Sequence, residues 1–302
     1  MLRKQKSLVA LLTESGPLTG AQLMERCDME VFSLWQTCCK TPSIHLSSAA
    51  RRFLRLDRAV QGFARLSPSI RREFLTYTYV GLDSDVPVLM EKTAALKAEI
   101  KRISREKFAT ARACVLSAVE LFPERDILLE KACFLIAGDV VYDMAHTVPR
   151  PEKSTGEMVR GSDLDIIIVV EDDLDPALVS AFDIAFHKRK HLLLVNEREE
   201  IDYLIKSMAR VREQLRFDIF PSMVACKILH ESQFLHGNPE LHRKIKDLLQ
   251  EHGIPAKLQK MEQQAKINRE LAEAQLLKIR PGKDTCEYYT LFYTHAEEDE
   301  IY

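Results

Sequence analysis

The sequence has no CxxC pair, no long hydrophobic run and no internal repeat. These absences argue against a zinc or thiol redox protein, a membrane protein and a repeat protein, respectively. The seven cysteines are odd in number and scattered, without the spacing of a zinc or thiol redox site. The apolar run LVALL near the N-terminus is too short for the core of a signal peptide, and no later segment approaches membrane-spanning length. We therefore expect reduced thiols, a cytoplasmic location and no membrane partner.

What the sequence does contain is enough apolar material for a core, together with an uneven distribution of charge. Of its 302 residues 46% are hydrophobic, which predicts a globular chain with one large domain or two ordinary ones. Residues 1–82 carry twelve Lys and Arg against six Asp and Glu. Because the whole chain has a net charge of −2, residues 83–302 carry −8. A basic module is thus joined to an acidic one.

The basic module, residues 1–82, resembles a winged helix. Three short helical segments, SLVALLTESG, PLTGAQLMERCDM and EVFSLWQTCCK, precede two apolar or β-prone runs that Gly62 and Pro68 separate by a turn. Arginines in or near this predicted hairpin, within residues 51–72, could contact the phosphates of a nucleic acid. The alternative is a small helical domain that docks on a partner protein or forms a homo-oligomer. The arginines are Arg51, Arg52, Arg55, Arg58, Arg65, Arg71 and Arg72.

The rest of the chain divides by composition into three parts. Residues 83–122 are dominated by Ala, Leu, Glu and Lys up to Pro123, which predicts a helical linker. Residues 123–250 predict a domain with a mixed β-sheet, and residues 251–302 a C-terminal helix and tail. The expected fold class is therefore α+β.

The stretch RGSDLDIIIVV, residues 160–170, places two carboxylates at the start of a buried strand. In a strand, Asp163 and Asp165 point to the same face, about 7 Å apart along the chain. Carboxylate oxygens in this arrangement suit one or two Mg²⁺ ions. A turn cap followed by a rim charge is the alternative, but the desolvation cost of two acids before an apolar strand favours the metal site.

These residues, with LIAGDVVYDM upstream, resemble the signature of the nucleotidyltransferases of the DNA polymerase β superfamily. That signature is a strand, Gly-Ser, a helix, and then Ser-Asp-x-Asp before a hydrophobic strand, and the resemblance covers roughly residues 125–250. It implies transfer of a nucleoside monophosphate from a nucleoside triphosphate to a hydroxyl of a protein, an RNA or a small molecule, with two Mg²⁺ ions held by Asp163 and Asp165. It further implies that the nucleotide's phosphates lie against Gly138, Asp139, Gly161 and Ser162.

The family also has a third carboxylate on an adjacent strand, and we expect Asp218, in QLRFDIFPSM, to supply it. The rival acids Asp183 and Asp202 lie in segments that look helical. By this resemblance Asp218 would hold the ion that activates the attacking hydroxyl and would accept its proton. Either Arg160 or Lys227 is expected to face the phosphates.

The sequence departs from the family at Asp139, where other members have a serine. An aspartate there caps a helix well, but its charge repels phosphate. The interval from Gly138 to Asp163 is also longer than in most members. Three functions therefore stay open: a transferase in a bacterial toxin–antitoxin or defence system, a cyclic-nucleotide synthase of such a system, and a catalytically inactive regulator of the same fold that binds nucleic acid.

Overall fold

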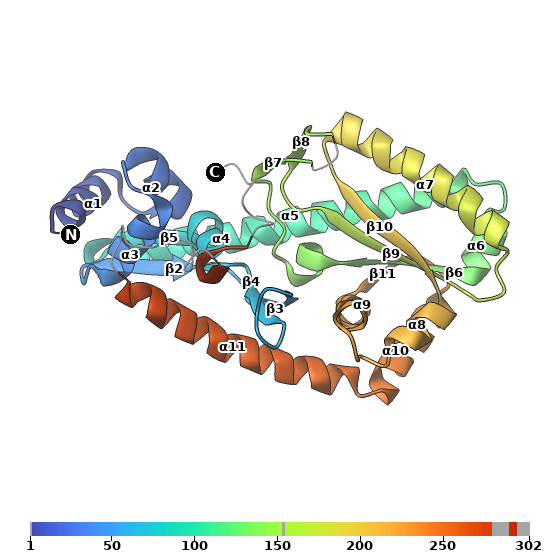
Figure 1. The fold of residues 1–302 in the computed structure, drawn as a ribbon. Coiled ribbons are helices and arrows are strands. Elements are labelled where there is room, and N and C mark those ends of the chain that lie inside the picture. The colour runs from blue at the N-terminus through green and yellow to red at the C-terminus, as the bar shows by residue number, and fades with distance from the viewer. Residues whose placement is uncertain (1, 153–154, 280–289, 295–302) are drawn as a thin grey trace. The chain divides into compact units, whose positions relative to one another are not determined.

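The computed structural model describes residues 2–152, 155–279 and 290–294 (Figure 1). It is an α+β protein whose chain forms two compact units, residues 1–100 with 262–302 and residues 101–261. Helices α5 (Val86–Glu120) and α11 (Ile254–Lys278) each belong partly to one unit and partly to the other. Within the described ranges no helix combines the length and the apolar character that crossing a membrane requires.

The first unit contains a small antiparallel sheet of strand order β1-β5-β2 and a separate hairpin, β3-β4. Its elements before α5 are, in chain order, α1 (Leu2–Ser15), β1 (Leu18–Thr19), α2 (Gly20–Arg26), α3 (Val31–Lys40), β2 (Ile44–Ser48), β3 (Phe53–Leu56), β4 (Ala64–Ser67), α4 (Ile70–Tyr77), β5 (Thr78–Leu82) and the 3₁₀ turn η1 (Asp83–Asp85).

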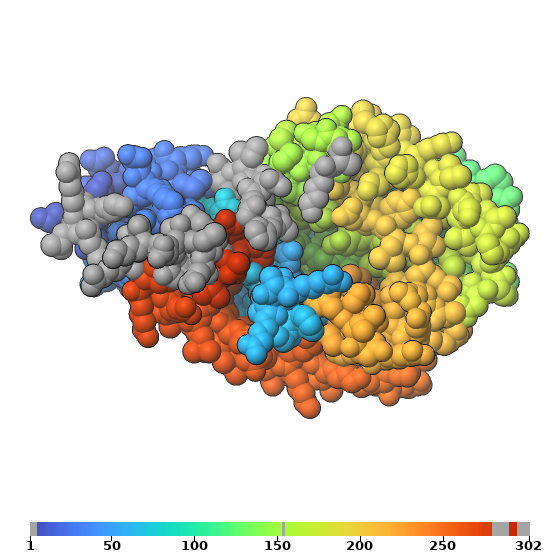
Figure 2. All heavy atoms as spheres, viewed as in Figure 1, coloured from blue at the N-terminus to red at the C-terminus, as the bar shows by residue number. Residues whose placement is uncertain are grey.

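The hairpin of the first unit lies within the predicted segment, but its second strand comes earlier than the sequence suggested. Phe53–Leu56 pairs with Ala64–Ser67, and the light-blue spheres of this hairpin are visible on the face shown in Figure 2. The following run, expected to be apolar or β-prone, begins as helix α4. The Ser69 hydroxyl accepts a hydrogen bond from the Arg72 amide at 3.1 Å, which caps that helix and explains the difference.

The C-terminal region belongs to the first unit because ion pairs and core contacts attach it there. The buried Arg269 of α11 donates to Glu73 of α4 at 2.7 Å and to the Pro68 carbonyl at 2.9 Å. Arg52 forms two further hydrogen bonds with the Glu73 carboxylate. The division of the chain therefore differs from the predicted boundaries at 82, 122 and 250, because the predicted linker is shared and the described residues 262–279 and 290–294 belong with the N-terminal part. Residues 280–289 and 295–302 of the predicted tail lie outside the described ranges.

The second unit is built around a four-stranded mixed sheet of order β10-β9-β6-β11. Strand β10 runs parallel to β9, whereas the other neighbouring pairs are antiparallel. Besides α5 and the start of α11, its elements are α6 (Arg125–Lys131), β6 (Ala132–Ala137), the 3₁₀ turn η2 (Gly138–Tyr142), β7 (Pro149–Pro151), β8 (Met158–Arg160), β9 (Leu164–Val170), α7 (Pro176–Glu197), β10 (Ile201–Ser207), α8 (Met208–Gln214), α9 (Phe220–Glu231), β11 (Gln233–Gly237) and α10 (Pro239–Glu251).

The alternation of residues in β9 separates the two faces of this sheet. Ile166 and Ile168 point into a core that includes Val115 of α5 and Phe182 of α7. Asp165 therefore points to the opposite face, where α9 and α10 contact strand β6 (Figure 1). The sheet is covered by helices on both faces, and the acidic side chain lies on the face away from the large apolar core.

A buried ion pair fixes the backbone near the N-terminal ends of β9 and β10. The Lys107 ammonium of α5 contacts the Glu199 carboxylate and donates to the Arg160 carbonyl at 2.8 Å. The side chains of Lys107 and Glu199 are only 3% and 8% exposed. Burial lowers the pKa of Lys107, and the nearby Glu199 carboxylate opposes that shift. Because neither charge reaches water, each depends on the other for compensation.

We therefore expect Lys107→Met to lower the free energy of unfolding by about 3–5 kcal/mol, because it leaves the Glu199 charge buried without its partner. The double variant Lys107→Met with Glu199→Leu should recover most of that loss, since it leaves no unpaired charge. Urea unfolding of the wild type and the variants measures both values. Equal losses in the single and double variants would contradict the assignment.

Candidate functional site

Two neighbouring strands bring carboxylates to one edge of the second unit's sheet. Asp165, the second residue of β9, is paired with Asp202 on the parallel strand β10 and with Ala137 on the antiparallel strand β6. Paired residues of neighbouring strands point to the same face, so the Asp165 and Asp202 side chains are neighbours. Asp163 lies two residues before Asp165, just outside β9. We call Asp163, Asp165 and Asp202 the carboxylate edge.

The prediction that Asp218 lies on a strand beside Asp163 and Asp165 is wrong. Asp218 is exposed and lies in the irregular segment between α8 and α9. The preceding residue, Phe217, has a φ of 56°, a left-handed conformation that a strand cannot contain. The prediction that Asp202 belongs to a helix is also wrong, because Asp202 lies within strand β10.

Gly138 forms the turn at the end of β6 and touches the carboxylate edge directly. Its φ is 73°, and a Cβ atom placed there would lie 2.0 Å from Oδ2 of Asp165. The Gly138 amide donates to the Glu231 carboxylate at 3.3 Å, and the Tyr142 hydroxyl donates to the same carboxylate at 2.6 Å. Only glycine allows both the backbone conformation and the close approach. Nothing in the local sequence near Glu231 indicated its position, because its partners lie about ninety residues away.

Gly161 and Ser162, predicted to line the phosphates, shape the turn before β9. A Cβ atom at Gly161 would lie 2.1 Å from the His146 carbonyl oxygen, so a glycine is needed for this approach. The buried Ser162 hydroxyl donates to the Asp139 carboxylate at 3.0 Å and accepts from the His146 amide at 3.2 Å. Asp139, at the family's serine position, is thereby held against the turn that precedes the carboxylate edge.

Negative charges are crowded around Asp165. Burial raises the pKa of Asp165 well above its usual range, and the nearby carboxylates of Asp163, Asp139, Asp202 and Glu231 raise that pKa further. The folded chain therefore holds a proton on Asp165 more tightly than the unfolded chain does. Any cation that binds beside Asp165 would relieve this repulsion.

Three basic side chains from surrounding elements pair with individual acids of this region. Arg150 of β7 lies 3.7 Å from Asp163, and Lys190 of α7 lies 3.6 Å from Asp202. Lys227 of α9 forms an ion pair with Glu231. Of the two residues predicted to face phosphates, Lys227 is therefore paired with Glu231, whereas the Arg160 side chain is 59% exposed and 4.0 Å from Glu199.

The carboxylate edge fits Mg²⁺ in its chemistry, although its side chains do not converge on one point. Hard carboxylate oxygens on adjacent strands are the ligands that Mg²⁺ prefers. Among the residues that the structure describes, no three His, Cys, Asp or Glu side chains are grouped closely enough to hold an ion. Like-charged carboxylates repel one another, and each outer one is turned toward its own cation.

The contact between Gly138 and Asp165 predicts an unequal cost for two alanine substitutions. Gly253 also has a positive φ, 64°, but a Cβ atom there meets nothing within 4 Å. We expect Gly253→Ala to lower stability by about 1–2 kcal/mol through backbone strain alone. Gly138→Ala should cost about 1–3 kcal/mol more, because the added atom collides with the Asp165 carboxylate. Urea unfolding measures both, and equal costs would contradict the close approach.

The crowding of acids predicts that Asp165→Asn stabilises the protein in metal-free buffer. Since the pKa of Asp165 is raised on folding, its contribution to stability falls as pH rises from about 4 through the raised pKa. At pH 7 we expect the variant to be more stable by on the order of 1 kcal/mol, given about 1.4 kcal/mol for each pKa unit. The difference should shrink toward pH 4, as thermal unfolding across this range would reveal. A less stable variant at pH 7 would contradict the crowding.

Comparisons with known proteins assign no family to this arrangement. No family model matches the chain, and no match was found among curated proteins or among solved structures. The chemistry of the carboxylate edge therefore has to be inferred from its own geometry.

Proposed function

We propose that the second unit is a Mg²⁺-dependent nucleotidyltransferase that uses the carboxylate edge. The main support for this proposal is the pairing of Asp202 with Asp165 across two parallel strands. Asp163 lies two residues before Asp165 in the chain. A third carboxylate on the adjacent strand is what the resemblance to the polymerase β superfamily requires. Asp202 takes the role for which the sequence had suggested Asp218.

The residues of the edge divide the proposed reaction between them. Asp163 and Asp165 would hold two Mg²⁺ ions, which would supply positive charge to offset the negative charge of the triphosphate. Asp202 is 59% exposed, so it can be reached by an acceptor molecule whose hydroxyl loses its proton to it. The acceptor oxygen then forms a bond to the α-phosphorus as the bond to pyrophosphate breaks. The transferred group is a nucleoside monophosphate.

A second candidate is a catalytically inactive regulator with the same fold, and the Gly138 turn favours it. At this turn the family grips phosphate, yet here the Gly138 amide is bonded to Glu231 and the next residue is Asp139. Two carboxylates would repel a triphosphate from that position. A cyclic-nucleotide synthase would need room for two nucleotides, and product chromatography would distinguish it from single transfer.

For the first unit we propose a winged-helix-like fold. The order of α1, β1, α2, α3, β2 and β5, with β5 central in the sheet, supports it. Nucleic-acid contact through residues 51–72 stays a prediction. The ion pairs of two arginines and the burial of helix α3 count against it. Arg52 is paired with Glu73 and Glu273, and Arg65 with Asp57. Helix α3, which would enter a groove of DNA, has six of its ten residues buried.

The transferase proposal is tested by pyrophosphate release from each nucleoside triphosphate in the presence of Mg²⁺. We expect Asp163→Asn, Asp165→Asn and Asp202→Asn each to lower the rate by about two to four orders of magnitude. Asp218→Asn is the matched control, because Asp218 is an exposed aspartate outside the carboxylate edge, and it should leave the rate unchanged.

The pattern among these variants separates the candidates. Loss of activity in the Asp163 and Asp165 variants but not in Asp202→Asn would remove Asp202 from the reaction. Release that none of the three substitutions affects, or no release with any triphosphate, would favour the inactive regulator.

A further inference from the structure

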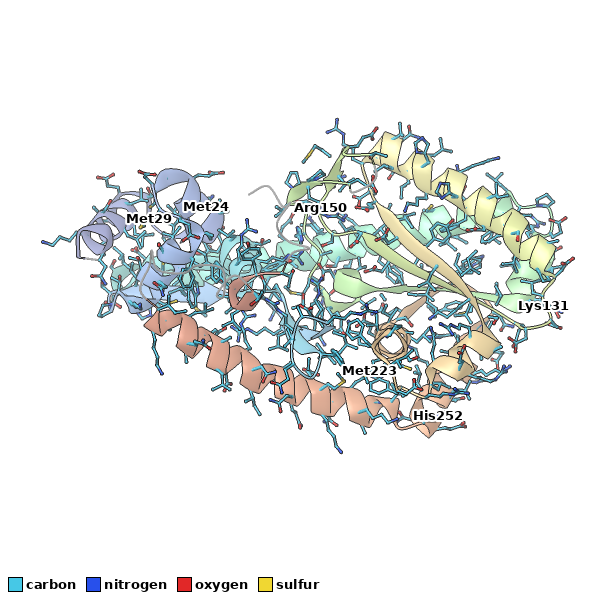
Figure 3. All side chains as sticks on the ribbon, in the orientation of Figure 1. Met24, Met29, Lys131, Arg150, Met223 and His252 are labelled. Atoms are coloured by element: carbon cyan, nitrogen blue, oxygen red, sulfur yellow. The ribbon has the colours of Figure 1, made fainter. Side chains whose placement is uncertain are left out.

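The Arg150 side chain has no role in the proposed transfer, yet it forms three polar contacts beside the carboxylate edge. It comes from β7 of the short hairpin β7-β8, where Figure 3 labels it. Its Nε donates to the Gly161 carbonyl at 3.0 Å, and its Nη2 lies 2.7 Å from Glu200 and 3.7 Å from Asp163. Only 14% of the side chain is exposed.

These contacts place one positive charge between the segments that lead into β9 and β10. Gly161 and Asp163 precede β9, and Glu200 precedes β10. The Leu164 amide donates to the Glu200 carbonyl at 2.9 Å, which starts the pairing of the two strands. The guanidinium therefore compensates acids at the place where the strands carrying the edge begin. Because little water reaches it, its charge acts there more strongly than it would in solvent.

We infer that Arg150 is an internal counter-cation, a positive charge of the protein itself that partly neutralises Asp163 and so weakens the binding of free divalent cations there. This inference rests on the proposed function. A metal ion on the Asp163 carboxylate would lie close to the guanidinium and be repelled by it. The edge is thereby compensated without metal, and a metal ion gains most when an anionic ligand arrives with it. Arg150 thus makes metal loading depend on the triphosphate, and its effect passes through Asp163, which makes it a positioning residue.

The effect of removing Arg150 on metal affinity distinguishes this role from that of an arginine that only stabilises the loop. A structural arginine holds the loop, so its loss would disorder Asp163 and weaken metal binding. A counter-cation competes with the metal, so its loss would strengthen metal binding even as the metal-free protein becomes less stable. The two roles predict opposite signs for one measurement.

The experiment titrates the full-length chain with Mn²⁺ alone and follows free Mn²⁺ by electron paramagnetic resonance. We expect Arg150→Gln to bind Mn²⁺ about tenfold more tightly than the wild type, because a nearby positive charge is gone. Arg150→Lys keeps the charge and should stay within about twofold of the wild type. Arg212→Gln is the matched control, since Arg212 of α8 pairs with Asp172 beyond the C-terminal end of β9, and it should leave the affinity unchanged.

A second variant covers the case in which Arg150→Gln folds poorly because Glu200 is left without its partner. The double variant Arg150→Gln with Glu200→Gln removes both charges and leaves no unpaired acid. It should bind Mn²⁺ more tightly than the single variant Glu200→Gln, because those two proteins differ only in the charge of Arg150. Thermal unfolding without metal checks that each variant is folded.

The outcomes separate this inference from the proposed function. If the wild type binds Mn²⁺ and removing the Arg150 charge tightens binding in neither comparison, Arg150 is not a counter-cation, and the transferase proposal stands. If no variant binds Mn²⁺, this inference fails, whereas the transferase proposal is decided by the pyrophosphate-release measurement. Tighter binding in Arg150→Gln that disappears when Asp163→Asn is added supports the inference and locates the metal at the carboxylate edge.

Discussion

Repulsion among carboxylates is the constraint on which the edge of the second sheet depends. Asp165 sits among four other acids, and burial opposes its ionisation as well. Glycine at position 138 keeps the backbone close to that carboxylate, where any side chain would collide with it. A fold selected only for stability would place an apolar residue at position 165, as it does at Ile166 and Ile168. A local loss of stability of this kind is typical of a site that binds a ligand or a metal ion.

The surrounding cations show how the fold tolerates that loss of stability. Arg150, Lys190 and Lys227 come from three different elements, and each pairs with a different acid. At the opposite end of the β6–β9 pair, Lys131 forms an ordinary exposed pair with Asp173 (Figure 3). The negative charge near the carboxylate edge is therefore offset by separate ion pairs on the surrounding elements. The acids do not share one cation.

The sequence predicts those residues of the site whose pattern lies within one short segment, and it does not predict contacts between residues distant in the chain. Asp163, Asp165 and the strand behind them are adjacent in sequence, so an apolar run after Asp-x-Asp was sufficient to predict them. Asp202 was assigned to a segment that looked helical, although Ile201, Tyr203 and Ile205 alternate with polar or exposed residues as in a strand. Arg150 and Glu231 act on partners distant in sequence, and no local pattern reports such contacts.

Net charge illustrates the same limit for the first unit. Residues 1–82 carry +6 and residues 83–100 carry −2, whereas the described C-terminal residues of this unit, 262–279 and 290–294, carry no net charge. The described part of the first unit therefore keeps an excess of positive charge, but much of that charge is paired inside the unit. Glu273 of α11 meets Arg52, and Arg269 of the same helix joins the Glu73 cluster, so the arginines contribute to internal cohesion. An attraction of this unit for nucleic acid would draw on its positive excess, but the charge of Arg52 and Arg269 is offset locally by Glu73 and Glu273.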